Sequence, residues 1–264
     1  MNKEAEIQML WIGDALSPIE QLSMKSFLYH GHTVVLYAYD DIQGIPKDVI
    51  VRDADTIVPR LKIFKHMNSY AAFADLFRWK LMVEKGGYYC DTDVICLQPF
   101  SFVEDVVIGY EALNILTPTI LGFDIESDAI ELAKRMLYCA EHPLEWYPWD
   151  STSQKLRKLR YWLSYKKHHA VGWGETAGPI GITNLYNHVK NSYHISPQPI
   201  DVFYHIAYTQ WQKFIEPHQL SWDMFPKEAV AIHLWNEMWH RAGISKYQQF
   251  DKTSFVGQAM ERYA

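Results

Sequence analysis

The sequence predicts an α/β fold in which helices flank a central sheet of mostly parallel strands. The first observation is a strand, a helix and another strand in succession over residues 7–39, because two strands joined through a helix usually pair in parallel. The second is that further strand and helix patterns continue along the chain. The third is size and composition, since 264 residues that are 48% hydrophobic can bury a substantial core. We therefore expect a single domain over residues 1–264.

The first helix has the clearest boundary signal in the chain. Ser17 at the N-cap, Pro18 at the first helical position and Glu20 at the third form the pattern of a capped helix start. The apolar run at residues 7–12 precedes this helix and predicts a buried strand. The run at residues 32–39 follows the helix and predicts the second strand.

The remaining elements follow from apolar spacing and from turn residues. Residues 49–58 are expected to contain a short strand. The apolar residues between Phe73 and Leu81 have helical spacing, which predicts a helix from about residue 68 to Gly86. We further expect strands at residues 88–90, 94–97, 106–110, 119–123 and 229–235, a helix at residues 127–141, and a helix or loop from residue 245 onward.

The charge balance and the cysteines exclude several classes of protein. A net charge of -6 argues against a nucleic-acid partner. The chain has 3 cysteines and no Cys-x-x-Cys pair, so we expect a reducing compartment and neither a disulfide framework nor a cysteine zinc site. The N-terminus lacks the apolar stretch of a signal peptide, and no window approaches the ~18 consecutive apolar residues of a membrane span. We expect a cytoplasmic protein whose membrane contact, at the inner face of the cytoplasmic membrane, would be peripheral.

Two carboxylates stand at a break between two apolar runs. Asp91 and Asp93 follow residues 88–90 and precede residues 94–97. In an extended segment, residues two apart share a face, and two like charges there repel unless a cation lies between them. Hard oxygen ligands suit Mg²⁺ or Mn²⁺, which often bridge protein carboxylates and substrate phosphates. The pair therefore predicts a metal site; the alternative is a polar turn, where aspartate is common.

Two further features lie on either side of this pair in the sequence. Asp75 and Arg78 are three residues apart on the predicted helix, so they share a face, either as a surface ion pair or as donor contacts. His233 lies on the predicted strand at residues 229–235, where alternation places it with Trp235 on the face away from the core. It either completes the metal site or is a half-buried histidine with a structural partner.

The runs around these residues closely resemble a known signature. ADLFRWKL at residues 74–81 and GGYYCDTDV at residues 86–94 resemble the DXD signature of glycosyltransferase family 32. That family includes bacterial capsule and lipooligosaccharide transferases, and it is related to the glucosyltransferase domains of large clostridial toxins. WIG at residues 11–13 and IHLWN at residues 232–236 resemble the family's first strand and its C-terminal His-x-Trp stretch.

A shorter segment between them also resembles the family. Gly178-Pro179 with Thr183 is similar to its Thr-Gly-Pro segment, although Ala177 stands where a threonine is often found. The roughly 60 residues from about Glu141 carry little of the resemblance.

The resemblance implies a GT-A fold, a Rossmann-like arrangement with the DXD turn beside the donor site. It implies that Asp91 and Asp93 bind Mn²⁺ or Mg²⁺, with His233 as a further metal ligand or as a phosphate contact. Asp75 and Arg78 would contact the donor's ribose, sugar or diphosphate and complete the catalytic set. The other donor contacts would be Trp11, Ile12, Thr92, Trp235 and Asn236.

The activity so implied is transfer, with retention, of a hexose or N-acetylhexosamine from a UDP-sugar to a saccharide, free or lipid-linked, of a bacterial capsule or lipopolysaccharide. The metal would neutralise charge on the leaving diphosphate. Asp124 and Glu175 are candidates for acceptor contacts. Two alternatives stay open: a metal-dependent phosphohydrolase acting on nucleotide sugars or phosphate esters, and a non-catalytic sugar-binding module.

Residues 142–175 are expected to form an aromatic and helical insertion that faces the acceptor or a membrane. The basic stretch Lys155–Lys167, in a chain of net negative charge, predicts contact with anionic lipid or with an anionic glycan. The alternative is a solvated helix face. Trp146, Tyr147 and Trp149 precede this stretch and form either an acceptor platform or core.

Overall fold

The structure is a computed structural model that describes residues 6–164, 169–193 and 195–264. It divides into two compact units, each assembled from separate parts of the chain. The first unit comprises Asp53–Tyr89 and Val103–Pro197, and the second comprises Asn2–Arg52, Cys90–Phe102 and Gln198–Ala264. The single domain expected over the whole chain stays a prediction.

The second unit opens with the predicted strand, helix and strand. These are β1 (Ile7–Trp11), α1 (Pro18–Tyr29) and β2 (Val34–Ala38), and β1 and β2 pair in parallel with Ile7 opposite Val34. β3 (Ile50–Asp53) continues the order β3-β2-β1. The rest of the unit contains β5 (Val94–Cys96), α6 (Ile200–Phe203), β8 (Ala231–His233), α7 (Asn236–Arg241), α8 (Phe255–Arg262) and 3₁₀ turns at Tyr208–Phe214 and Trp222–Met224.

The capped start of α1 is confirmed in detail. The Ser17 hydroxyl accepts from the Ile19 N–H at 3.2 Å, and the Glu20 carboxylate accepts from the Ser17 N–H at 2.8 Å. Further along α1, the buried Ser23 hydroxyl donates to the Val94 carbonyl at 2.6 Å. The Ser26 hydroxyl accepts from the Cys96 N–H at 2.8 Å. Two serines of α1 therefore fix the short strand β5, whose position sets the preceding Asp-Thr-Asp turn.

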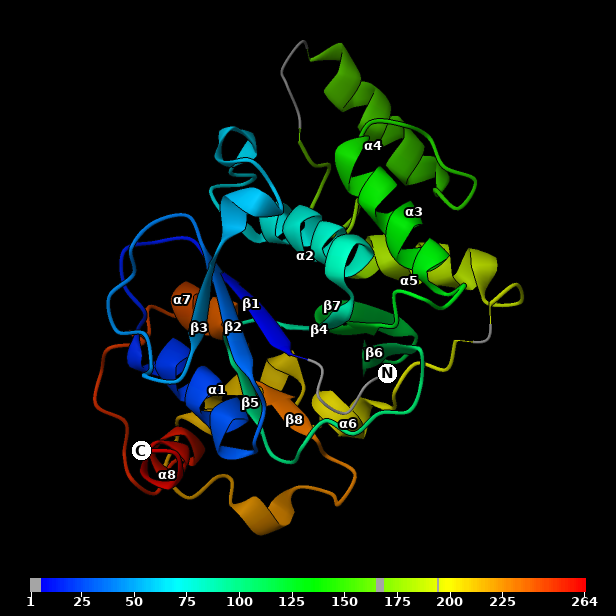
Figure 1. The fold of residues 1–264 in the computed structure, drawn as a ribbon. Helices are drawn as coiled ribbons and strands as arrows, with labels where there is room; N and C mark the ends of the chain where they lie inside the picture. Colours follow the sequence, from blue (N-terminus) through cyan, green and yellow to red (C-terminus); the bar gives the residue numbers. More distant parts are fainter. Residues whose placement is uncertain (1–5, 165–168, 194) are drawn as a thin grey trace. The chain divides into compact units, whose positions relative to one another are not determined.

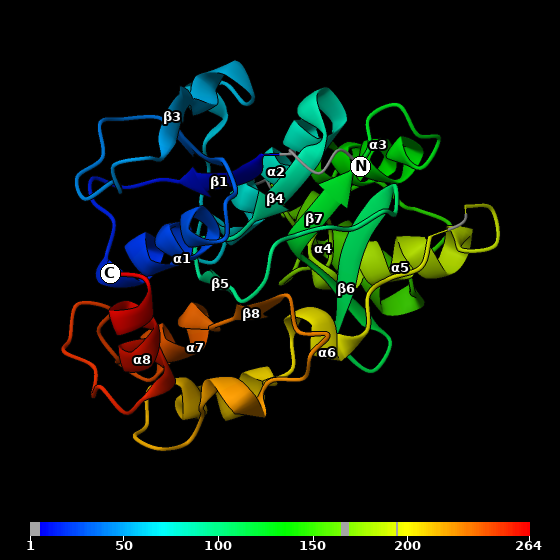
Figure 2. The ribbon, with the colours of Figure 1, turned by 60° about the horizontal axis from the view of Figure 1, so that its bottom comes forward.

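β5 pairs in antiparallel fashion with β8, and the two strands lie beside α7 in the lower part of Figure 2. The predicted strand at residues 229–235 is too long. The structure has only Ala231–His233, because Trp235 adopts a left-handed conformation with φ of 59° and ends the extended backbone. The prediction that His233 and Trp235 share one strand face is therefore wrong.

The first unit contains β4 (Gly87–Cys90), β6 (Val106–Ala112) and β7 (Ile115–Phe123) in the order β4-β7-β6, with β6 and β7 antiparallel. Its helices are α2 (Ala71–Lys85), α3 (Ile130–Glu141), α4 (Thr152–Leu163) and α5 (Pro179–Val189), with short 3₁₀ turns at Ala54–Thr56 and Arg60–Lys62. α2 packs on α3, and α5 packs on β7 (Figure 1). The predicted α/β class with flanking helices is confirmed.

Two predicted helix starts are too early. α2 begins at Ala71 and not at residue 68, because Met67 and Asn68 have φ of 50° and 63° and cannot belong to a right-handed helix. α3 begins at Ile130, after turns that involve residues 124–129. Among the described residues, no helix combines the length and the apolar character that crossing a membrane requires.

Candidate active site

The Asp-Thr-Asp segment lies in the second unit as a turn directly before β5. The expected extended backbone across Asp91, Thr92 and Asp93 is wrong, since all three lie outside the strands and Thr92 and Asp93 form a turn. β5 pairs Val94 with His233, and the Leu234 N–H donates to the Asp93 carbonyl at 2.9 Å. Strand pairing therefore brings the histidine of β8 beside the second aspartate of the turn.

The Asp93 carboxylate is held by two groups from the chain around β8. Its Oδ2 lies 3.1 Å from Nε2 of His233, and the Asn236 N–H donates to the same oxygen at 3.0 Å. Burial acts to raise the pKa of Asp93. The charge and hydrogen bond of His233, the Asn236 N–H and the charge of Lys246 outweigh burial and hold the pKa below its ordinary value. The Asp93 carboxylate is thus deprotonated at neutral pH.

The side chains of Asp93 and His233 are spaced to share a divalent cation, which would replace the proton of the hydrogen bond between them. An octahedral ion with bonds of about 2.1 Å places neighbouring ligand atoms roughly 3 Å apart. The 3.1 Å between Asp93 Oδ2 and His233 Nε2 matches this spacing. Within the described parts of the chain, no group of three or more His, Cys, Asp or Glu side chains is arranged to hold a metal ion. The three-residue ligand set with Asp91 therefore stays a prediction, and further ligands would come from substrate phosphate and water.

Trp235 is engaged with its neighbours through both its ring and its indole N–H. Its ring lies 4.1 Å from the ring of His233, measured between centroids, so it packs against the candidate ligand. Its indole N–H, however, donates to the Ile206 carbonyl at 2.8 Å. This N–H is therefore engaged within the unit, and the donor contact assigned to Trp235 stays a prediction. Asn236 follows with a buried side-chain oxygen that has no hydrogen-bond partner among the described residues.

Lys246 is a cation that the sequence did not single out. Its Nζ lies 5.2 Å from the ring centroid of Trp11 and forms an ion pair with the buried Glu20. Its charge also contributes to the lowered pKa of Asp93. Lys246 comes from a loop with no distinguishing pattern, so no sequence signal marked it.

Trp11 and Ile12 lie at the end of β1 in the same unit, and both are half-buried. The indole N–H of Trp11 is buried and has no hydrogen-bond partner among the described residues. A buried donor of this kind usually finds a partner, which a bound ligand can supply. Thr92 is half-buried in the turn.

The first unit holds the other predicted donor contacts, Asp75 and Arg78. Their side chains are only 15% and 6% exposed, so the interpretation as a surface ion pair is wrong. The guanidinium donates to the Pro118 carbonyl at 2.8 Å and lies 5.0 Å from the ring centroid of Tyr89. Its Nε is 3.7 Å from the Asp75 carboxylate. Arg78 is therefore fixed within the unit, where it orients Asp75.

Asp75 lies against the backbone at Gly178. A Cβ atom built on Gly178 would lie 2.9 Å from Asp75 Oδ2 and 2.7 Å from the Gly174 Cα, closer than such atoms approach. The φ of Gly178 is −89°, which any residue can adopt. Glycine is therefore required at this position because there is no room for a side chain, and not because of the backbone conformation. Nearby, the Thr183 hydroxyl accepts from the Leu116 N–H at 2.9 Å and ties α5 to β7.

Gly178→Ala is expected to lower the free energy of unfolding by ~1–3 kcal/mol, as an extra methyl group does in a packed site. It should also displace the Asp75 carboxylate. Chemical denaturation measures the first effect. Gly31→Ala, where the methyl meets no atom within 4 Å but the φ is 82°, measures the separate cost of backbone strain without a steric clash. A Gly178→Ala protein as stable as the parent chain would contradict the close approach.

Glu175 and Asp75 line one small pocket of the first unit, with room for roughly one water molecule (about 20 Å³). Glu175 pairs with Arg157 of α4 at 2.6 Å. Its other oxygen, Oε2, is buried and has no hydrogen-bond partner among the described residues. The structure thus brings one predicted acceptor residue beside one predicted donor residue. Asp124 instead caps a local turn, where its carboxylate accepts from the Glu126 N–H at 3.0 Å.

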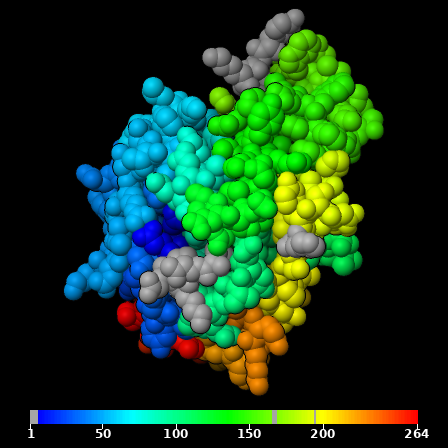
Figure 3. All heavy atoms as spheres, turned by 45° about the vertical axis from the view of Figure 1, so that its right-hand side comes forward, coloured from blue at the N-terminus to red at the C-terminus, as the bar shows by residue number. Residues whose placement is uncertain are grey.

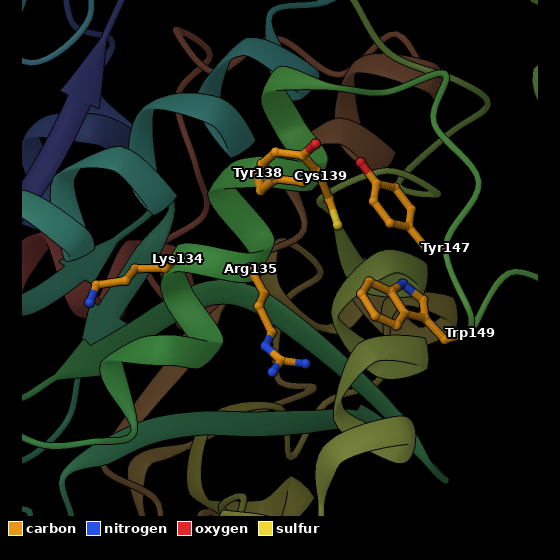
Figure 4. Close-up of a pocket in the computed structure, with 6 residues that line it drawn as sticks. All are labelled: Lys134, Arg135, Tyr138, Cys139, Tyr147 and Trp149. Carbon is orange, nitrogen blue, oxygen red and sulfur yellow. The ribbon is translucent and has the colours of Figure 1, made fainter.

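A larger hollow of about 320 Å³ lies on the other side of α3 (Figure 4). α3 contributes to both cavities: Ala140 lines the small pocket, and its neighbour Cys139 lines the larger one. Tyr147 and Trp149 form one wall with parallel rings 5.1 Å apart. Arg135 and Lys134 also line this hollow, and Lys134 points away from the two rings in the close-up. The predicted platform is therefore a stacked pair, with Trp146 left exposed.

Comparison with protein families gives two matches along the chain. Residues 33–113 match the model of the "glycosyltransferase sugar-binding region containing DXD motif". This range contains Asp75, Arg78, Asp91 and Asp93. The resemblance to sugar transferases with a DXD motif is confirmed. Residues 178–263 match the "alpha 1,4-glycosyltransferase conserved region", which contains Gly178, His233 and Lys246.

A curated human protein is similar over most of the chain. It is named alpha-1,4-N-acetylglucosaminyltransferase and is 27% identical over 216 residues, which are 77% of this chain and 55% of the human protein. The chain therefore spans about half the length of this curated relative.

Solved structures with some similarity also have glycosyltransferase titles. PaToxG glycosyltransferase has a TM-score of 0.48 and 17% identity, over 71% of this chain and 70% of that one. The apo form of the glycosyltransferase GlyE of Streptococcus pneumoniae has a TM-score of 0.46 and 14% identity, over 98% of this chain and 60% of that one.

Proposed function

We propose that this chain is a metal-dependent glycosyltransferase of GT-A type that moves a hexose or an N-acetylhexosamine from a UDP-sugar to a saccharide. The observation that carries the proposal is the Asp93 carboxylate, ionised and paired with His233 at 3.1 Å inside the unit that also contains Trp11 and Lys246. It lies in the segment that matches the DXD family model. The name of the human relative supports an N-acetylhexosamine as the transferred sugar.

Asp93 and His233 would hold Mn²⁺ or Mg²⁺, with Asp91 contributing directly or through water. Such an ion acts as a Lewis acid that stabilises the negative charge on the departing diphosphate. The protein's own contribution is to keep the Asp93 carboxylate ionised and oriented, through the Asn236 N–H and the charge of Lys246. Lys246 adds a positive charge beside Trp11, which suits a nucleotide base stacked near a diphosphate.

In the other unit, Arg78 fixes Asp75, and the free oxygen of Glu175 would accept a hydrogen bond from an acceptor hydroxyl. Retention of configuration needs no dedicated base, because the leaving phosphate oxygen can take the acceptor proton. The acceptor we propose is a free or lipid-linked saccharide of a bacterial surface polymer, capsule or lipopolysaccharide, and the location is the cytoplasm.

The proposal is tested by thermal-shift measurements with UDP-, GDP- and CDP-sugars, each with and without Mn²⁺. A ligand that binds the folded state raises the melting temperature, and at 100 times its Kd it stabilises the fold by about 2.7 kcal/mol. We expect a large shift with one UDP-sugar and only in the presence of Mn²⁺. Mass spectrometry with saccharide acceptors then detects transfer.

Each rival function gives a different result. Release of phosphate without sugar transfer would indicate the phosphohydrolase. A shift with free saccharide but with none of the nucleotide sugars would indicate a sugar-binding module. An equal rise in melting temperature with and without Mn²⁺ would refute the proposal that a metal ion binds the diphosphate.

Lys246→Met is expected to weaken binding of the UDP-sugar by about tenfold or more, since hydrogen bonds to charged groups contribute roughly 1.5–3 kcal/mol. It also leaves the buried Glu20 without this partner, so some loss of stability is expected. Lys246→Arg keeps the charge and should retain most of the binding. Donor titration calorimetry measures the affinity, and the exposed Lys47→Met is the control. Equal donor affinity in Lys246→Met would remove this lysine from the site.

A further inference from the structure

α4 is an amphipathic helix that buries its polar side and exposes its apolar side, the opposite of an ordinary surface helix. Leu156, Leu159 and Leu163 lie on its exposed side, with 57%, 37% and 54% of their surfaces accessible. Gln154 and Lys158 lie on its buried side. In a water-facing helix of a folded protein the apolar side is expected inside. Exposed leucines in one row on a helix mark a surface that meets a partner.

The polar side of α4 is held inward by specific contacts. The Lys158 ammonium pairs with Asp150 at 2.6 Å, donates to the Glu145 carbonyl at 2.7 Å and lies 4.3 Å from the ring centroid of Tyr147. The Gln154 side chain closes the capping box at the start of the helix. Turning the leucine row inward would break a buried ion pair, so the rotation of α4 is fixed by its surroundings.

The charges around the leucine row are all positive. α4 contains Lys155, Arg157, Lys158 and Arg160 and no acidic residue, in a chain of net charge -6. At about 100° per residue, Lys155 and Arg160 lie on opposite sides of the row. Trp162 stands beside Lys155 and is 66% exposed. Leucine and tryptophan bordered by basic side chains are typical of a helix that lies in a membrane interface.

We propose that this leucine face of α4, formed by Leu156, Leu159, Trp162 and Leu163, docks on an anionic lipid bilayer. The leucines and the indole enter the headgroup region, while Lys155 and Arg160 pair with lipid phosphates. The lime-green spheres of α4 reach the surface at the upper right of Figure 3. A second copy of the chain is a poorer occupant, because two such faces would bring like charges together.

The sequence also predicted that the stretch Lys155–Lys167 faces a membrane, on the ground of its basic residues. In the structure, exposed apolar side chains of α4 would make the main contact with the lipid, and the basic residues would add to it. Lys166 and Lys167 lie outside the described residues. Arg157 is engaged with Glu175 and is not needed for docking. The proposal goes beyond the proposed activity and does not depend on it.

The test is co-sedimentation of the full chain with vesicles of phosphatidylcholine, alone or mixed with phosphatidylglycerol. We expect binding to the anionic vesicles and little to the neutral ones. Leu156→Gln/Leu163→Gln should lower vesicle affinity at least about tenfold, because two leucines lose their transfer into the apolar region. Lys155→Gln/Arg160→Gln should remove the preference for the anionic lipid.

The matched control is Leu61→Gln/Leu113→Gln, which alters two leucines outside α4 that are 99% and 83% exposed. Exposed substitutions of this kind change stability little, so all variants should fold. Absence of binding to any vesicle would overturn the proposal, as would an equal loss of binding in the control. Self-association of the parent chain that Leu156→Gln/Leu163→Gln abolishes would assign the face to a protein interface and also overturn it.

Discussion

Asp93→Asn is expected to lower the rate of sugar transfer by roughly 10²- to 10⁴-fold, because stabilisation by a bound metal is worth several kcal/mol in the transition state. The variant keeps an oxygen that can accept from the Asn236 N–H, as the carboxylate does at 3.0 Å. The fold should therefore survive while the negative charge is lost. Initial rates with a UDP-sugar and Mn²⁺ measure the effect.

A second measurement separates metal binding from catalysis. Mn²⁺ binding to the protein with UDP, followed by electron paramagnetic resonance, should weaken in Asp93→Asn and remain in Asp48→Asn, which alters an exposed aspartate of the same unit. Unchanged Mn²⁺ binding in Asp93→Asn, or full transfer in the presence of a chelator, would show that the carboxylate next to His233 does not hold a cation.

Local signals predicted the parts of the fold that local forces determine. The capped start at Ser17 and Glu20 was predictable because all of its hydrogen bonds join residues at most three apart. The Asp-Thr-Asp segment could be located because residues 86–94 resemble the DXD signature. Neither signal specifies backbone conformation, and the turn at Asp91–Asp93 replaced the extended segment that was expected.

Contacts between distant segments account for the errors. The Trp235 N–H donates to the carbonyl of Ile206, which lies 29 positions away in the chain, and no periodicity reveals such a partner. Lys246 reaches Trp11 and Glu20 across more than 200 positions of the chain. The burial of Arg78 likewise depends on the Pro118 carbonyl of β7. These are tertiary contacts, and they decide which predicted donors remain available to a ligand.

In α4 too, the sequence pattern predicts the helix, but tertiary contacts decide how it packs. Its leucine spacing predicts an amphipathic helix, but spacing alone does not tell which side is buried. Here the surroundings decide, because the loop at residues 142–150 presents Asp150 and the Glu145 carbonyl to Lys158. An ammonium that satisfies both is more easily buried than a leucine facing the same polar groups.

Lys158→Met is therefore expected to lower the free energy of unfolding by ~3–5 kcal/mol, the usual result of removing one partner from a buried ion pair. Only 4% of the Lys158 side chain and 3% of the Asp150 side chain are exposed, so the remaining carboxylate would be an uncompensated buried charge. Chemical denaturation of the parent chain and the variant measures the difference. Lys155→Met, on the same helix but outside this pair, should cost much less.

The double variant Lys158→Met/Asp150→Asn tests the cause of that loss. Asparagine is neutral, and its side-chain oxygen can still accept from the Tyr147 N–H, which lies 2.8 Å from the Asp150 carboxylate. If the unpaired charge causes the loss, the double variant should regain most of the stability, and the two substitutions will be strongly non-additive. A cost for Lys158→Met below ~1 kcal/mol, as for a surface pair, would mean that the ion pair does not fix the rotation of α4. The leucine face could then turn inward, and its outward position would need another explanation.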